Sequence, residues 1–177
     1  ELTPAQLPAF LQARAFKGIN VTIPYKQAVI PFLDELAQEA EEIGAVNTIY
    51  LKDGMVVGDN TDYVGFIRQL KYYNIDVYDK DVYVLGNGGS SKAIKYALNE
   101  LGANVFVVSR SGAEMSYETL MKINHYDLLI NTTPLGMYPN IDVCPDIPYE
   151  LLSSDHLLYD LLYNPDETLF MRKGKEQ

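Results

Sequence analysis

The chain has 177 residues, of which 47% are hydrophobic, and a formal net charge of -10 at pH 7. This length accommodates one large domain or two small ones. A negative net charge without a basic run argues against a nucleic-acid partner, and no apolar stretch is long enough to suggest a membrane span.

The cysteine and histidine content limits the chemistry further. Cys144 is the only cysteine, which excludes an internal disulfide and fits a reducing compartment, so we expect a cytoplasmic protein. His125 and His156 stand apart in the sequence, without a Cys or His partner at ligand spacing. We therefore predict that the chain binds no metal.

The N-terminal part begins with a predicted helix over residues 1–15. Residues 19–23 then alternate apolar and polar side chains, which predicts a strand. Pro24 ends that strand, and Lys26 follows at its end, where the active sites of α/β proteins gather. From the residues alone, Lys26 is equally well explained as a solvent-exposed lysine after an edge strand.

A helix and a hairpin are expected next. Apolar residues at helical spacing cover residues 33–43, and Gly44 stands where a helix commonly ends. Residues 45–50 and 55–57 predict two strands of a hairpin, joined by a turn over residues 52–54.

A cluster of polar residues opens the following helix. Residues 63–73 have apolar side chains at helical spacing, and Asp59, Asn60, Thr61 and Asp62 precede them. Capping a helix needs only one such residue. The surplus of polar residues indicates a functional site, and we place the domain junction around this helix.

The stretch that follows organises the rest of the chain. A strand over residues 82–85 leads into a glycine-rich turn, a helix over residues 93–101 and a strand over residues 104–108. This is the context of the dinucleotide-binding fingerprint. Glycines let the backbone approach a pyrophosphate, and the helix N-terminus offers N–H groups to phosphates. Ser91 replaces the third motif glycine, so the match is partial, and a plain structural turn is the alternative.

The end of the second strand refines the expected ligand. Chains that bind NAD usually place an acid there to hold the ribose 2′-hydroxyl, whereas this chain has Ser109, Arg110 and Ser111. An arginine suits a 2′-phosphate, so NADP is favoured over NAD. The alternative is a solvated arginine on a surface loop.

The C-terminal part adds two further strands, over residues 126–130 and 157–162. Between them, residues 131–137 form a polar loop at a strand end, where cofactors lie in such sheets. Asn164 is then expected to cap a helix that has Pro165 at its first position. Four strands of a cofactor-binding sheet are therefore readable.

Six blocks along the chain resemble the shikimate dehydrogenase family, which includes shikimate/quinate dehydrogenases. Together, and in this order, the blocks are highly specific, and they extend over nearly the whole chain. They are Asn20-Val21-Thr22-Ile23-Pro24-Tyr25-Lys26, Gly44-Ala45-Val46-Asn47-Thr48, Gly58-Asp59-Asn60-Thr61-Asp62, the glycine-rich turn, Asn131-Thr132-Thr133-Pro134-Leu135-Gly136-Met137 and Asp160-Leu161-Leu162-Tyr163-Asn164-Pro165.

The resemblance implies an α/β fold in two parts. A partial mixed α/β substrate domain would cover residues 1–62, followed by a Rossmann-like, doubly wound parallel-sheet NADP-binding domain over residues 63–177. The family's N-terminal strand, with a serine pair for the substrate carboxylate, and its C-terminal segment have no counterpart here. The chain therefore resembles a piece of a longer protein that is incomplete at both ends.

The family reversibly reduces 3-dehydroshikimate to shikimate with NADPH, a step toward aromatic amino acids. By resemblance, the catalytic residues are Lys26 and Asp62. The substrate would be bound by Thr22, Lys26, Asn47, Asp62 and Tyr163. The NADP cofactor would be bound by Gly86, Asn87, Gly88, Gly89, Ser90, Ser109, Arg110, Ser111 and Leu161.

These residue types suit the chemistry. Hydride delivery to a ketone leaves negative charge on the oxygen, and a positioned ammonium stabilises that charge and donates the proton. A neighbouring carboxylate orients the lysine and binds a substrate hydroxyl.

Two other interpretations remain open. A quinate/shikimate dehydrogenase that uses NAD is one, although Arg110 argues against it. A non-catalytic nucleotide-binding module or truncated inactive fragment is the other. The missing ends favour it, and the retention of Lys26 and Asp62 argues against it. The expected partner is a small-molecule substrate, and a monomer and a homodimer fit the sequence equally.

Overall fold

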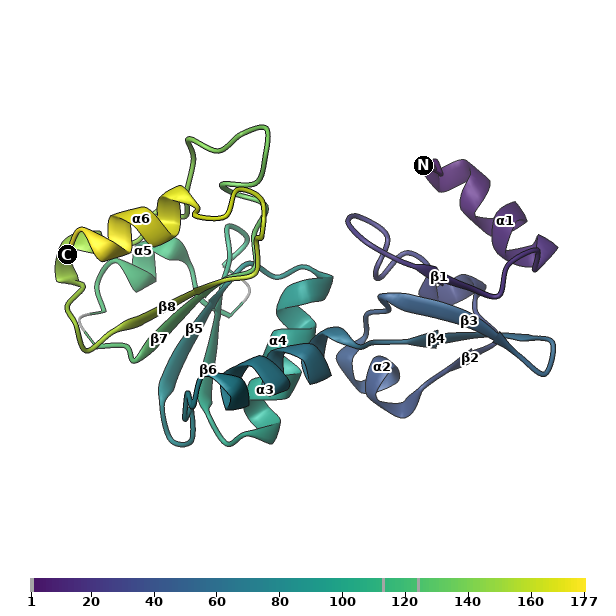
Figure 1. The fold of residues 1–177 in the computed structure, drawn as a ribbon, viewed down its shortest axis with the longest axis horizontal. Coiled ribbons are helices and arrows are strands. Elements are labelled where there is room, and N and C mark those ends of the chain that lie inside the picture. The colour runs from purple at the N-terminus through teal and green to yellow at the C-terminus, as the bar shows by residue number, and fades with distance from the viewer. Residues whose placement is uncertain (1, 113, 124) are drawn as a thin grey trace.

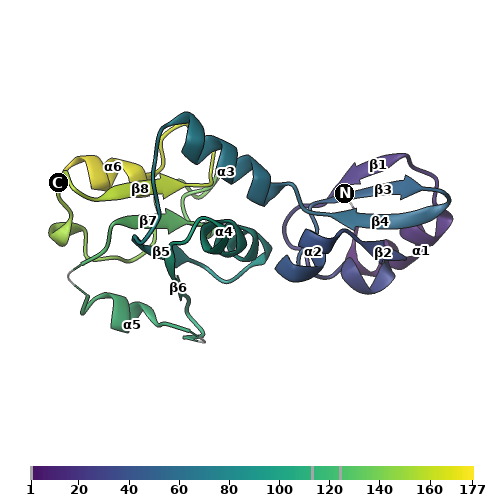
Figure 2. The same cartoon turned by 90° about the horizontal axis from the view of Figure 1, so that it is seen from below.

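The computed structural model describes residues 2–112, 114–123 and 125–177. These residues form two four-stranded sheets that lie side by side, with α3 (Asp62–Tyr72) leading from one to the other (Figure 1). We call them sheet A, with strand order β1-β3-β4-β2, and sheet B, with strand order β6-β5-β7-β8. Figure 2 shows the same two parts from below.

Sheet A is mixed and is built from the first part of the chain. Its strands β1, β3 and β4 pair antiparallel, while β2 pairs parallel with β4. Buried side chains, among them Leu11 and Ile49, pack α1 against this sheet. The elements are a 3₁₀ helix (Pro4–Gln6), α1 (Leu7–Ala13), β1 (Gly18–Asn20), a second 3₁₀ helix (Ile30–Phe32), β2 (Glu35–Leu36), α2 (Gln38–Ile43), β3 (Thr48–Lys52) and β4 (Met55–Asp59).

Three predictions for sheet A need correction. The strand expected over 19–23 ends at Asn20, because the chain then turns and the Tyr25 N–H donates to Thr22 O (2.8 Å). The helix expected over 33–43 begins only at Gln38, since the preceding backbone pairs with β4 instead. The strand expected over 45–50 begins at Thr48.

The hairpin between β3 and β4 is confirmed. Asp53 and Gly54 have φ values of 53° and 79°. Both lie in the left-handed region, which suits the two-residue turn of a hairpin. The turn joins Lys52 to Met55, which face each other in the strand register.

Sheet B is entirely parallel, as predicted for a doubly wound fold. The four expected strands are present, and α5 and a short 3₁₀ helix are additional elements that the sequence did not indicate. After α3, the elements are β5 (Asp81–Leu85), α4 (Gly89–Glu100), β6 (Asn104–Val108), α5 (Tyr117–Leu120), β7 (Leu128–Asn131), a 3₁₀ helix (Tyr149–Leu151), β8 (Leu157–Asp160) and α6 (Leu169–Lys175).

Helices cover both faces of sheet B. Val82 and Val84 of β5 face α3 and α4, while Tyr83 and Leu85 face α5 and α6. This alternation follows from the two-residue period of a strand. Because both faces are covered, these strands are almost continuously apolar, which is why they were readable in the sequence.

The helix expected after Asn164 is wrong in its start. The Asn164 carbonyl accepts the Tyr138 N–H (3.1 Å), so that residue belongs to a loop contact. Helix α6 begins at Leu169, and the Thr168 hydroxyl caps it by accepting the Met171 N–H (3.4 Å).

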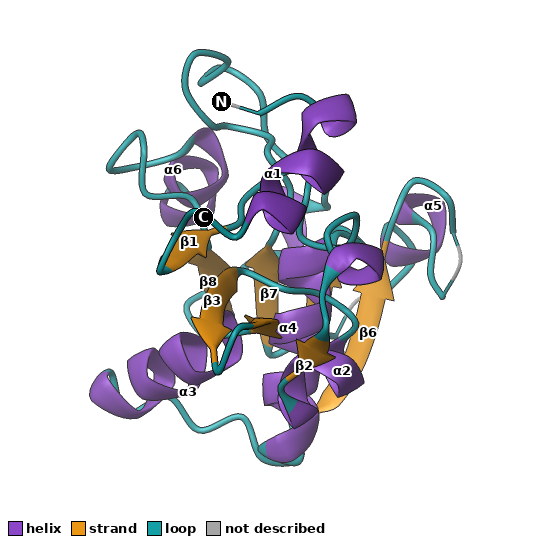
Figure 3. Cartoon of the chain, turned by 90° about the vertical axis from the view of Figure 1, so that its right-hand side faces the viewer, coloured by secondary structure: helices purple, strands orange, loops and turns teal. Residues whose placement is uncertain are grey.

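The two sheets meet where α2 packs against α4. Ile43 of α2 and Ala93 of α4 are buried together with Ala45, and the rings of Tyr63 and Tyr96 make an edge-to-face contact at 5.2 Å. Figure 3 shows the chain from the side of sheet A, with α2 near α4. This contact sets the position of sheet A beside the carboxyl end of β5.

Candidate active site

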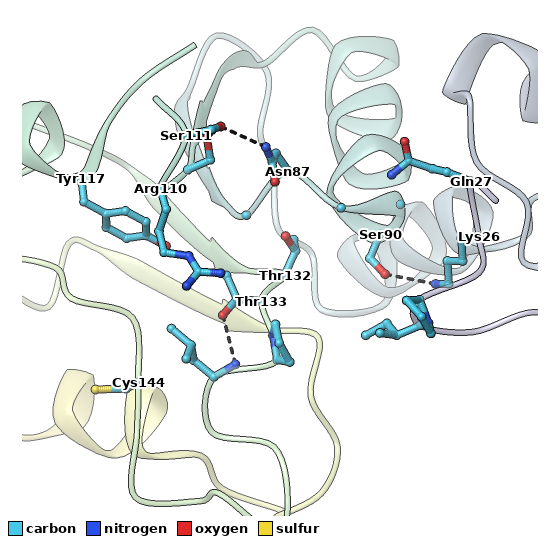
Figure 4. A pocket seen from close by; sticks show the side chains of 18 of the residues that line it. Lys26, Gln27, Asn87, Ser90, Arg110, Ser111, Tyr117, Thr132, Thr133 and Cys144 are labelled. Atoms are coloured by element: carbon cyan, nitrogen blue, oxygen red, sulfur yellow. Dashed lines mark hydrogen bonds between the residues drawn. The ribbon is translucent and has the colours of Figure 1, made fainter. Parts of the chain in front are cut away.

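A cavity of about 820 Å³ lies at the carboxyl ends of the sheet B strands and extends to Lys26 (Figure 4). Strand β5 has β6 on one side and β7 on the other, so the turn after β5 lies at the topological switch point where such sheets bind ligands. The cavity is lined by Ile23, Pro24, Lys26, Gln27, Gly86, Asn87, Gly88, Gly89, Ser90, Ser109, Arg110, Ser111, Tyr117, Thr132, Thr133, Pro134, Leu135, Cys144 and Asp146.

The glycine-rich turn forms one wall of the cavity. Gly86 has a φ of 112°, and a Cβ there would lie 2.7 Å from Thr132 Oγ1, so only glycine fits. The Ser91 hydroxyl donates to the Gly86 carbonyl (2.6 Å) and fixes the turn. Within the described residues no side chain caps α4. Its first N–H groups are therefore available to a bound anion.

The end of β6 forms the second wall. The Ser109 and Ser111 hydroxyls lie 2.9 Å apart, and the Asn87 amide donates to Ser111 Oγ (3.3 Å), which ties this wall to the glycine-rich turn. Arg110 is exposed and its side chain extends into the cavity (Figure 4). Burial raises the pKa of the neighbouring Tyr117 phenol, and the Arg110 charge offsets part of that rise.

Lys26 reaches the edge of the cavity from the sheet A side. Its Nζ donates to Asp62 Oδ2 (2.8 Å) and to Ser90 Oγ (3.0 Å). The side chain is only 14% exposed, and that of Asp62 is 29% exposed. Lys26 is therefore a mostly buried cation that faces the cavity, not a solvated surface lysine.

The polar cluster before α3 holds Asp62 in place. The Asn47 amide donates to Asp62 Oδ1 (2.8 Å) and accepts the Thr61 N–H through its Oδ1 (2.9 Å). The buried Asn60 donates to the Ala45 carbonyl (2.9 Å), and its Oδ1 accepts the Asp62 N–H (3.0 Å). These residues form one hydrogen-bonded network that ends on the Lys26 ammonium.

The structure brings most of the predicted site residues together. Lys26, the glycine-rich turn and residues 109–111 line one cavity, and Asn47 and Asp62 lie directly behind Lys26. Thr22, Leu161 and Tyr163 are not among the residues that line it. Thr22 is exposed, and Tyr163 is 89% exposed. The Leu161 N–H donates to the carbonyl of Asn131, the last residue of β7 (3.1 Å).

Several cavity residues were not named individually as site residues from the sequence. Thr132 and Thr133 follow β7 directly, so the polar loop after that strand was the signal for them. Gln27 adjoins Lys26 in the sequence. Tyr117 and Asp146 come from segments whose sequence gives no sign of the site.

A hub of largely buried polar side chains, centred on Asn131 and Asp160, supports the part of the cavity wall that contains Thr133. The fully buried Asn131 donates to both Asp160 carboxylate oxygens (3.1 and 3.2 Å) and accepts the Thr133 hydroxyl (2.7 Å). Asp160 also accepts the Thr168 hydroxyl (2.7 Å) and the Leu162 N–H (3.0 Å). Burial raises the pKa of Asp160 despite these donors. The hub therefore connects β7, β8 and the start of α6 to the cavity wall.

The fold defines an α/β protein with a parallel sheet of the dinucleotide-binding kind and a second, mixed-sheet part that places a lysine–carboxylate pair at the cavity. A family model described as the shikimate dehydrogenase substrate binding domain matches residues 3–49. The NADP(+) shikimate dehydrogenases of Carboxydothermus hydrogenoformans and Clostridium botulinum strain Hall are 41% and 38% identical to the chain, each over 94% of it. The chain belongs to the shikimate dehydrogenase family.

A solved structure gives the same result. The shikimate dehydrogenase of Thermus thermophilus, in complex with NADP(H) and shikimate, superposes with a TM-score of 0.80 at 34% identity over 98% of this chain. The match covers 68% of that structure, and 66% and 69% of the two curated relatives. The chain thus spans about two thirds of the length of the relatives it matches.

Proposed function

We propose that the protein is an NADP-dependent shikimate dehydrogenase, which reversibly reduces 3-dehydroshikimate to shikimate in aromatic amino acid biosynthesis. Membership of the family supports this activity. The observation that carries the proposal is the Lys26–Asp62 pair, at 2.8 Å, which opens onto the same cavity as the glycine-rich turn. A merely nucleotide-binding protein would not need a mostly buried, oriented cation there.

The cavity fits the cofactor. Its volume of about 820 Å³ lies within the usual range for ligand pockets, roughly 300–1,000 Å³. The N-terminus of α4 would hold the pyrophosphate, and Arg110 the ribose 2′-phosphate. When bound, the reduced cofactor supplies the hydride for the reaction.

The remaining chemistry belongs to side chains of the sheet A part. Lys26 would donate a proton to the substrate oxygen that becomes negatively charged during reduction. Asp62 orients the ammonium and would bind a neighbouring substrate hydroxyl. Asn47 keeps Asp62 in place, and it would contact the substrate together with Thr22 and Tyr163.

The proposal also covers the cofactor preference, the division into domains and the cellular location. Arg110 favours NADP over NAD, as the phosphate of NADP would pair with a guanidinium. We assign residues 1–62 to substrate binding and residues 63–177 to cofactor binding. A single cysteine suits the cytoplasm.

The test is an absorbance assay of nicotinamide reduction in the natural polypeptide that contains these residues. Shikimate with NADP should give the fastest rate among the four combinations of shikimate or quinate with NADP or NAD. Faster turnover with quinate and NAD would move the protein to the other branch of the family. Cofactor binding without reduction of either nicotinamide would leave a non-catalytic module.

A further inference from the structure

The Lys26 side chain lies against the first turn of α4. A Cβ on Gly89 would come within 2.8 Å of Lys26 Cβ and 3.4 Å of Ala45 Cβ, so the absence of a side chain at Gly89 makes room for the lysine stem. Beyond the stem, Nζ reaches Ser90 in the next position of the helix (3.0 Å), as Figure 4 shows. The lysine thus reaches from the sheet A part to a helix of the sheet B part.

This position is electrostatically unfavourable for a cation. The N-terminus of an α-helix carries a partial positive charge, which repels an ammonium within its first turn. Lys26 therefore needs hydrogen-bond acceptors to stay there. Within the part of the chain that the structure describes, Nζ has two: the Asp62 carboxylate at 2.8 Å and the Ser90 hydroxyl at 3.0 Å. Of these, Ser90 belongs to the cofactor-binding turn.

The neighbouring serine has a different task. Ser91 is 2% exposed, and its hydroxyl donates to the Gly86 carbonyl (2.6 Å). It fixes the shape of the glycine-rich turn and has no contact with the lysine ammonium among the described hydrogen bonds. Two adjacent hydroxyls of the same helix turn therefore serve the turn and the lysine separately.

We propose that Ser90 is a positioning residue for Lys26, whose hydroxyl oxygen holds the ammonium at the edge of the cofactor cavity. Ser90 acts through Lys26, in addition to any contact it makes with the cofactor. This inference rests on the proposed function in so far as Lys26 is the proton donor. The contacts that support the inference are independent of the reaction. They are the hydrogen bond between Lys26 and Ser90 and the packing of the lysine stem against Gly89.

The experiment compares Ser90→Ala, Ser90→Thr and Ser91→Ala, with Ser90→Ala also made in a Lys26→Ala background. Three quantities are measured on the natural polypeptide: kcat, the calorimetric Kd for NADP, and the rate at which an amine-reactive reagent modifies Lys26 without cofactor. The last is followed by mass spectrometry of the peptide that carries Lys26. Ser91→Ala is the matched control, since it removes the adjacent hydroxyl.

Ser90→Ala should lower kcat about tenfold, the lower end for a hydrogen bond to a charged group, and this loss should remain at saturating NADP whatever the change in its Kd. Lys26 should react severalfold faster with the reagent, because one of its two restraining bonds is gone. Ser90→Thr keeps a hydroxyl and should restore both values. Ser91→Ala should weaken NADP binding and leave the Lys26 reaction rate unchanged.

The outcomes separate this inference from the proposed function. If Ser90→Ala changes neither kcat nor the reactivity of Lys26, the positioning role is wrong. The role is also wrong if the kcat loss persists undiminished in the Lys26→Ala background, since Ser90 would then act through the cofactor alone. Absence of turnover in the unchanged protein would overturn the proposed function, and a Lys26→Ala variant with full kcat would remove Lys26 from the mechanism. In both cases, the modification rate of Lys26 in the Ser90 variants would still decide whether Ser90 holds the ammonium.

Discussion

The two sides of the cavity are built by different means. On the sheet A side, the chemistry depends on a few side chains, Lys26, Asp62 and Asn47, which hold one another through hydrogen bonds of 2.8 Å. On the sheet B side, the cradle is mostly backbone, the glycine-rich turn and the N-terminus of α4, with Arg110 as the main charged side chain. Substitutions of side chains on the first side should therefore change catalysis most, and substitutions on the second side should change cofactor binding most.

The largest expected effect is that of Lys26→Ala. General acid–base groups contribute roughly 10²–10⁴-fold to rate, so kcat should fall by that factor while the Kd for NADP stays nearly unchanged. Steady-state kinetics and calorimetry measure the two quantities. Lys52→Ala, an exposed lysine at the end of β3, serves as the control and should change neither. A variant that keeps most of its kcat would remove Lys26 from the mechanism.

Arg110→Ala should affect only the cofactor side. A charge-assisted hydrogen bond is worth roughly 1.5–3 kcal/mol, or about ten- to a hundredfold in affinity. NADP binding should weaken by that factor while NAD binding stays the same, so the preference disappears. Titration of both cofactors measures this, with the exposed Arg68→Ala as control. If NAD already binds as tightly as NADP in the unchanged protein, the role given to Arg110 is wrong.

Gly89→Ala should break the separation of the two sides, because Gly89 belongs to the cradle and also contacts Lys26. The added Cβ would lie 2.8 Å from Lys26 Cβ, so the lysine stem or the helix must shift. Overpacking of this kind costs roughly 1–3 kcal/mol. Stability, kcat and NADP affinity should therefore all fall.

The control for this variant is Gly65→Ala in α3, where an added Cβ meets nothing within 4 Å. It should be neutral or slightly stabilising, since alanine is the better helix former. Thermal unfolding and kinetics on both variants make the comparison. If Gly89→Ala behaved like Gly65→Ala, the two sides would not be in contact at this glycine.

The smallest expected effects concern two aspartates at opposite ends of the sheet B strands. At the amino end of β7, Asp127 accepts the Asp81 N–H (2.8 Å) and pairs with Lys80 (3.1 Å), which lowers its pKa. At the carboxyl end of β8, burial raises the pKa of Asp160. A carboxyl group whose pKa is lowered in the folded protein stabilises the fold at pH values above the ordinary pKa of about 3.9. This stabilisation is lost as the pH falls through the lowered pKa. A carboxyl group whose pKa is raised in the folded protein stabilises the fold at pH values below the ordinary pKa. This stabilisation is lost as the pH rises through the raised pKa.

Melting temperatures of Asp127→Asn and Asp160→Asn against pH test the signs. The advantage of the unchanged protein over Asp127→Asn should grow as pH rises from about 3 to 6. Its advantage over Asp160→Asn should shrink over the same range. If both melting-temperature differences changed with pH in the same direction, the opposite pKa shifts assigned to Asp127 and Asp160 would be wrong.

The elements of sheet B could be predicted from the sequence because each is specified by a short, continuous run of residues. Strand β5, the glycine-rich turn and α4 are consecutive, and strands buried on both faces are continuously apolar. Sheet A was harder, because β2 has two residues and forms only by pairing with β4, more than twenty positions further along. Helical spacing through Leu36 was a real pattern, but the backbone pairing of Asp34 and Ala37 overrode it.

The same distinction applies to the site. The polar cluster around Asp62 and the glycine-rich turn were visible as residue types at fixed spacing. The bond from Lys26 to Ser90 joins positions 64 residues apart. The Asn131–Asp160 contact depends on the register of β7 with β8. Such contacts follow only from the pairing of distant segments, which no local pattern specifies.

The proposed function requires that the cavity of sheet B and Lys26 from the sheet A side form one site for hydride transfer. The most direct test supplies the natural polypeptide with NADP and with shikimate that carries deuterium on the carbon whose hydroxyl is oxidised. The deuterium should then appear on one face of the nicotinamide ring of the reduced cofactor, as read by NMR. Reduced cofactor without deuterium, or no reduced cofactor although both ligands bind, would contradict that requirement.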